Sequence, residues 1–144
     1  MRTATGLLVF ALGLSLASRL RADEAAFQAS LSCQPTSGPG RILCQLTTRA
    51  TSGRLVWSDA LVVRAPAFAR PLRSRLVAQL GTSAAAGASA KLALVASEAG
   101  EGKLELLARG VICHDASGGE GCDPVLAPVT VELSVSPLSP KQPG

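Results

Sequence analysis

The sequence predicts an all-β protein: an immunoglobulin-like antiparallel β-sandwich of about seven short strands with two local disulfides. Apolar and polar residues alternate with a period of two in several short segments, as in strands with one buried face. Gly- and Pro-rich turn signals separate these segments about every ten residues, without the strand–helix alternation of a parallel sheet. Four cysteines form two pairs with ten and eight intervening residues.

Residues 1–22 have the organisation of a secretory signal peptide, with cleavage expected after Ala17 or Ala22. One basic residue precedes an apolar run at 7–17, which is shorter than the roughly 20 residues of a spanning helix. The alternatives are an uncleaved anchor and a buried core helix. Cys33 does not directly follow the apolar run, which argues against a lipid anchor. We therefore expect an exported protein, periplasmic or extracellular, without stable membrane insertion after cleavage.

The mature chain has the size of one domain, which we place at residues 23–135. Residues 136–144 contain three prolines and are expected to be a disordered tail. The formal net charge of +4 falls to +3 or +1 after cleavage, because Arg2, or Arg2 with Arg19 and Arg21, is removed. The charge is therefore weak support for an anionic partner. The excess of Arg over Lys and the abundance of Ala and Gly are typical of a GC-rich bacterial genome.

The first hairpin joins strands at 27–33 and 42–47 through the turn-rich stretch 34–40. Placing Cys33 opposite Cys44 puts both cysteines on the apolar face, because directly opposed residues share a face. The Cβ separation of such a pair is close to the distance that a disulfide needs. The same register predicts two further pairs, Leu31 with Leu46 and Ala29 with Thr48.

The middle of the chain contains two further predicted strands. Residues 55–63 form the third, with Trp57, the single tryptophan, as a core anchor. Residues 72–80 alternate and form the fourth, with charged side chains on one edge. The low-complexity stretch 81–90 is expected to be a mobile loop, with a short Ala-rich helix as the alternative.

The last third of the sequence predicts a hairpin of 91–96 with 103–113, joined by a turn that contains Gly100 and Gly102. A polar loop is then expected at 114–121, followed by a clean alternation at 129–135 that predicts the final strand.

Residues 111–135 run from a strand to Cys113, a polar loop, Cys122-Asp123-Pro124 and an alternating strand. This segment resembles the end of the immunoglobulin-like periplasmic N-terminal domain of DsbD-type thiol:disulfide interchange proteins. The resemblance implies the fold and an exchanging pair, Cys113 and Cys122. In that family fewer residues separate the cysteines and aromatic side chains shield them, whereas this chain has no tyrosine.

Residue chemistry favours a structural disulfide at Cys113 and Cys122 over an exchanging one. His114 could supply positive charge to a thiolate, but adjacent strand residues face opposite sides and the nearby acidic residues disfavour a thiolate. A four-cysteine zinc site is disfavoured because its ligands are usually spaced by about 2–4 residues. The acidic loop 114–123 matches no calcium loop, so we expect no metal and no cofactor.

Arg64 and a cluster of Arg70, Arg73 and Arg75 supply the main basic segment. The cluster is a candidate site for an anionic polymer or lipid head group, and a solvated strand edge is the alternative. Nucleic-acid binding is not expected, because it would need more charge and stacking aromatic residues. The sequence contains a single histidine and no nucleophile elbow, so an enzyme is disfavoured. We expect a non-enzymatic binding or envelope accessory protein; its partner is not identified by the sequence, and another envelope protein is a candidate.

Overall fold

The computed structural model describes residues 26–82, 87–116 and 118–139. The predicted signal peptide and the end of the predicted tail lie outside these residues, and residues 136–139 have no regular structure. Within the described residues there are nine strands, two of them 17 residues long, where about seven short strands were expected. The strands are β1 (Phe27–Cys33), β2 (Gly40–Ala50), β3 (Arg54–Arg64), β4 (Ala69–Pro71), β5 (Arg75–Val77), β6 (Gln79–Leu80), β7 (Ala88–Ala96), β8 (Gly100–Ala116) and β9 (Gly119–Val135).

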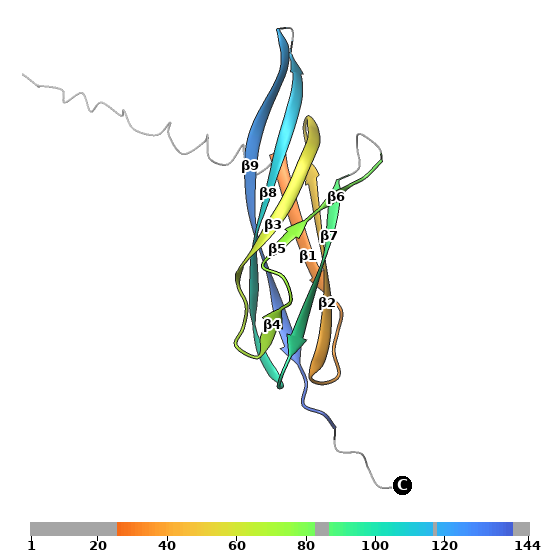
Figure 1. Cartoon of the computed structure of the whole chain (residues 1–144), viewed down its shortest axis with the longest axis vertical. Helices are drawn as coiled ribbons and strands as arrows, with labels where there is room; N and C mark the ends of the chain where they lie inside the picture. The colour runs from red at the N-terminus through yellow and green to blue at the C-terminus, as the bar shows by residue number, and fades with distance from the viewer. Residues whose placement is uncertain (1–25, 83–86, 117, 140–144) are drawn as a thin grey trace, which may run out of the picture.

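The strands form two antiparallel sheets that pack face to face (Figure 1). Sheet A has the order β1-β2-β7-β4, with β6 also paired to β7, and sheet B has the order β5-β3-β8-β9. This is the immunoglobulin arrangement, in which the first, second, fifth and fourth strands form one sheet and the third, sixth and seventh form the other. The predicted immunoglobulin-like sandwich is therefore confirmed, with β5 as an added strand beside β3. The described residues contain no helix that is long and apolar enough to cross a membrane.

The predicted first hairpin is confirmed residue by residue. Cys33 pairs with Cys44 across β1 and β2, and Leu31 pairs with Leu46, as the alternation required. The two cysteines form a disulfide with a Cα–Cα distance of 3.9 Å, and Cys44 is buried in the core. The second disulfide joins Cys113 to Cys122 across β8 and β9, so both bonds link neighbouring strands of one sheet.

The core between the sheets is built mainly from aliphatic side chains that alternate along the strands. One polar contact crosses it, because the hydroxyls of Thr48 in β2 and Ser58 in β3 lie 2.9 Å apart and both residues are buried. Each hydroxyl satisfies the other, so neither leaves an unpaired polar group in an apolar interior. The largest fully buried apolar side chains are Phe27, Leu46, Leu92, Leu94, Leu104, Leu106 and Ile112.

The segment between β3 and β7 passes from one sheet to the other and back. β4 pairs with β7 in sheet A, β5 pairs with β3 in sheet B, and β6 returns to β7. The continuous fourth strand expected at 72–80 is therefore wrong, because its alternating residues serve two different sheets. The loop expected at 81–90 ends earlier than predicted, since β7 begins at Ala88, which is buried.

The β8–β9 hairpin corrects the polar loop expected at 114–121. Strand pairing continues from Cys113 opposite Cys122 to Ala116 opposite Gly119, so most of that stretch is strand. β3 pairs with β8 only as far as Cys113, and the remaining hairpin projects beyond the neighbouring strands (Figure 1). Polar composition suggested a loop here, but a two-stranded extension has no core to cover and can be polar on both faces.

Candidate functional site

The outer face of sheet B carries an unusual group of apolar side chains. Residues that oppose one another on neighbouring strands share a face, and three adjacent rows of such residues run across β5, β3, β8 and β9. We call this surface the Trp57 face and define it by its residues: Trp57, Val111 and Pro124; Val77, Asp59, Arg109 and Leu126; and Arg75, Leu61, Leu107 and Pro128.

Trp57 lies on this outer face, so its predicted role as a core anchor is wrong. A bulge between Leu55 and Trp57 shifts the strand register, and Ser58 and Ala60 take the inward positions. Trp57 is 38% exposed, and Val77 and Leu126 are 68% and 57% exposed. Large apolar side chains are thus exposed together, which is a mark of interaction sites in folded proteins.

A buried carboxylate lies in the middle row of the Trp57 face. Arg109 donates from Nε to Oδ1 of Asp59 at 2.7 Å and from Nη2 to Oδ2 at 2.5 Å. Arg75 donates from Nε to Oδ2 at 2.8 Å, and the Asp59 side chain is fully covered. The hydrogen bonds from Arg109, supported by Arg75, lower the pKa of Asp59 despite the opposing effect of burial. Asp59 therefore stays ionised at neutral pH and holds both guanidinium groups in place.

Arg109, which Asp59 holds in place, also lies over the ring of Trp57. The Arg109 guanidinium carbon lies 5.8 Å from the centre of the Trp57 ring, within the range of a cation–π contact. Two arginines share one carboxylate here, so the cluster of Asp59, Arg75 and Arg109 keeps one uncompensated positive charge among neutral side chains. Sequence reasoning missed this site, because it depends on pairing β3 with β5 and β8.

The Cys113–Cys122 disulfide lies on the same outer face, next to the Trp57 rows. Cys122 is exposed and Cys113 is buried, so one sulfur-bearing residue is open to a reaction partner. Glu120 pairs with Arg54 beside the bond, and a Glu120 oxygen lies within 4.8 Å of both sulfur atoms. Among the described residues these three are the only group with metal-ligand spacing, but sulfurs joined to each other do not supply metal-binding thiolates.

His114 does not join the disulfide. It lies in β8 directly after Cys113, so the two side chains leave opposite faces of the strand. A side chain at Gly53 would meet the His114 ring, which places that ring beside the β2–β3 turn. The predicted opposite orientation of these adjacent strand residues therefore holds, and His114 is not placed to stabilise a Cys113 thiolate.

The predicted arginine cluster is separated by the change of sheets. Arg70 belongs to β4 in sheet A, Arg75 belongs to β5 and is bound to Asp59, and Arg73 lies between them. Arg75 is therefore not free for an external anion. Arg73 instead lines a hollow of about 420 Å³ on sheet A together with Arg41 and Lys91.

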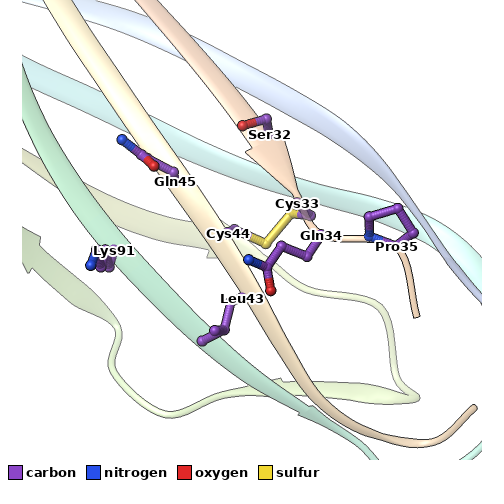
Figure 2. A pocket seen from close by; sticks show the side chains of 8 residues that line it. All are labelled: Ser32, Cys33, Gln34, Pro35, Leu43, Cys44, Gln45 and Lys91. Atoms are coloured by element: carbon purple, nitrogen blue, oxygen red, sulfur yellow. A yellow bond between two sulfur atoms is a disulfide. The ribbon is translucent and has the colours of Figure 1, made fainter. Parts of the chain in front are cut away.

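A second hollow of about 450 Å³ lies over the Cys33–Cys44 disulfide. Figure 2 shows Leu43 of β2 and Lys91 of β7 on one side of it, and Gln34 and Pro35 on the other. Leu43 and Lys91 line both hollows, so the two depressions are neighbours on the outer face of sheet A. Comparison of the chain with protein-family models, with curated proteins and with solved structures finds no match in any of the three.

Proposed function

We propose that this chain is an exported, non-enzymatic β-sandwich domain that binds another envelope protein through the Trp57 face. The proposal rests on the exposure of Trp57 among other apolar side chains of this face, with its ring in contact with Arg109 of the middle row. Tryptophan and arginine are enriched among the residues that contribute most to protein–protein binding, and surrounding apolar contacts exclude water from them.

The organisation of the Trp57 face supports binding rather than catalysis. Asp59 is enclosed by two guanidinium groups, so it offers no free oxygen to a substrate proton. The cluster instead orders two long side chains before a partner arrives, which lowers the entropy lost on binding. Two disulfides and the predicted signal peptide support export, because disulfides persist in oxidising compartments.

The charge of the face indicates the chemistry of its partner. One uncompensated positive charge at its centre favours a segment with apolar side chains around a single carboxylate. A second copy of this chain would place the same positive charge opposite itself, which disfavours a symmetric dimer through this face.

Selection from a displayed peptide library against the mature protein tests the proposal. We expect enrichment of apolar peptides that contain Asp or Glu, and binding about tenfold weaker to Trp57→Ser and to Leu126→Ser. Val95→Ser is the matched control, because Val95 is 43% exposed on the outer face of sheet A. Peptides that bind all variants equally, or self-association lost in Trp57→Ser, would overturn the proposed partner.

Thiol–disulfide exchange is the second candidate function, favoured by the exposure of Cys122. A partner thiolate would attack the Cys122 sulfur, form a mixed disulfide and release Cys113 as a thiolate. The Cys113 thiolate could then attack Cys122 and restore the original bond. Alternatively, a second partner thiolate attacks the partner's sulfur in the mixed disulfide and releases Cys122 as a thiolate, so that the partner is oxidised to a disulfide and Cys113 and Cys122 are left reduced.

The reduction potential of Cys113–Cys122 decides this second function. A value above about −230 mV, together with mixed disulfides trapped on Cys122 in Cys113→Ser, would support exchange. A value below about −300 mV would identify the bond as structural and remove the exchange function.

A further inference from the structure

The two sheets differ sharply in charge. The strands of sheet A contain no Asp or Glu, and they carry four basic residues, Arg41, Arg49, Arg70 and Lys91. The strands of sheet B carry seven carboxylates beside five basic residues. Every ion pair among the described residues lies on sheet B. The modest net charge of the whole chain therefore conceals one uniformly basic face.

We propose that the hollow lined by Arg41, Arg73 and Lys91 binds an amphipathic anion, a phosphate- or carboxylate-bearing molecule with an apolar chain. Three separate parts of the fold bring these cations together: β2, the segment between β4 and β5, and β7. None of the three has an ion-pair partner among the described residues. They are therefore available to an external anion, unlike Arg75.

The floor of the hollow explains why the ligand should be amphipathic. Leu43 pairs with Ala93, and the backbone N–H of Leu72 donates to the Ala93 carbonyl oxygen at 2.9 Å, so the three residues lie in one row. Leu43 is 38% exposed and Leu72 is 59% exposed. An anionic head group alone would leave these apolar side chains in water, whereas an attached hydrocarbon chain would cover them.

The size of the hollow suits one small ligand. Its volume of about 420 Å³ falls within the range of small-molecule sites, which combine apolar walls with a few placed polar groups. Guanidinium and ammonium groups donate charge-assisted hydrogen bonds to phosphate or carboxylate oxygens. The three cations come from β2, β7 and the segment between β4 and β5, and Leu76 of β5 is the only residue of sheet B that lines the hollow. None of the residues that define the Trp57 face lines it, so the proposal does not rest on the proposed protein-binding function.

Calorimetric titration of the mature protein with dodecyl phosphate below its micelle concentration tests the site. We expect saturable binding of dodecyl phosphate, and much weaker binding of inorganic phosphate and of dodecyl maltoside. Arg41→Gln, Arg73→Gln and Lys91→Gln should each weaken binding about tenfold, the loss expected for one charge-assisted hydrogen bond. Arg70→Gln is the matched control, because it removes the same charge from sheet A outside the hollow, and it should change affinity by less than about twofold.

Four results would overturn the proposal. Equal binding of dodecyl maltoside would show that the apolar chain alone is recognised, and equal binding of inorganic phosphate would remove the role of the apolar floor. Equal losses in Arg70→Gln and Arg73→Gln would show attraction to the whole basic face without a site. Salt-dependent binding to phosphatidylglycerol vesicles, without binding of monomeric dodecyl phosphate, would identify a membrane surface as the target instead.

Discussion

Removing the Cys33–Cys44 disulfide should destabilise the protein more than removing Cys113–Cys122. Their sequence separations of 11 and 9 are nearly equal, so the loop-closure model gives similar stabilisation, about 2.8 and about 2.6 kcal/mol. Each pair also contains one buried cysteine, but Cys44 belongs to the core between the sheets whereas Cys113 lies on the outer face of sheet B, so truncation to alanine leaves the larger core defect at Cys44. The expected difference therefore comes from where the two bonds lie in the folded state.

The Cys113–Cys122 bond closes the last row at which β8 is paired to β3. Beyond it, residues 114–116 pair only with residues 119–121, and an isolated two-stranded hairpin is marginally stable in water. Without the bond this tip can open without disturbing the core, and the regained entropy of the native state offsets part of the loss. We expect a loss of about 1 kcal/mol for Cys113→Ala with Cys122→Ala. Cys33→Ala with Cys44→Ala should cost at least about 3 kcal/mol.

Urea titrations of the two double variants, followed by circular dichroism under oxidising conditions, measure this difference. Mass spectrometry confirms that the remaining pair stays bonded in each variant. Equal losses for the two pairs, or a larger loss at Cys113–Cys122, would refute the reasoning and show that the projecting hairpin is coupled to the core.

Three further predictions concern single sites. Asp59→Asn should lower the free energy of unfolding by about 2 kcal/mol at pH 7, a value reduced by the partial exposure of its arginine partners. The lowered pKa stabilises the fold above the unfolded carboxyl pKa, so this difference should shrink below about pH 4; melting curves with a constant difference would contradict it. Thr48→Val should cost about 1–2 kcal/mol by leaving the Ser58 hydroxyl unpaired, whereas adding Ser58→Ala should recover part of it, and additive losses in a double-mutant cycle would exclude the coupling. Gly53→Ala should cost about 1–3 kcal/mol, because Gly53 has a φ of 74° and its Cβ would meet Ile112, while Gly121→Ala should be neutral in the same denaturation assay.

Local patterns predicted the parts of this fold that are held by neighbouring residues. The register of β1 with β2 follows from the alternation around Cys33 and Cys44, because placing Cys33 opposite Cys44 brings the pair within disulfide distance and keeps the apolar residues on the same face. The second local disulfide, Cys113–Cys122, was predicted from the short spacing of its cysteines rather than from strand register. Alternation also gave the sandwich class, since both sheets are antiparallel with one buried face each.

The candidate sites depend on long-range pairing, which local patterns do not contain. Arg75 and Arg73 are two residues apart, yet one binds Asp59 on sheet B and the other faces a hollow on sheet A. Trp57 was placed in the core because tryptophan is usually buried, but a bulge beside it changes which residues face inward. Nothing in the sequence indicated that all the carboxylates of the strands would lie on sheet B.

The position of β9 has a consequence for the timing of folding. The last strand packs beside the first, and Leu133 and Val135 complete the core against which Leu31 and Cys33 pack. The sandwich therefore cannot close until the polypeptide beyond residue 119 has left the ribosome and any translocation channel. Until then the growing chain leaves exposed the core residues that Leu133 and Val135 cover, so a truncation before β9 should be degraded rather than accumulate as a smaller domain.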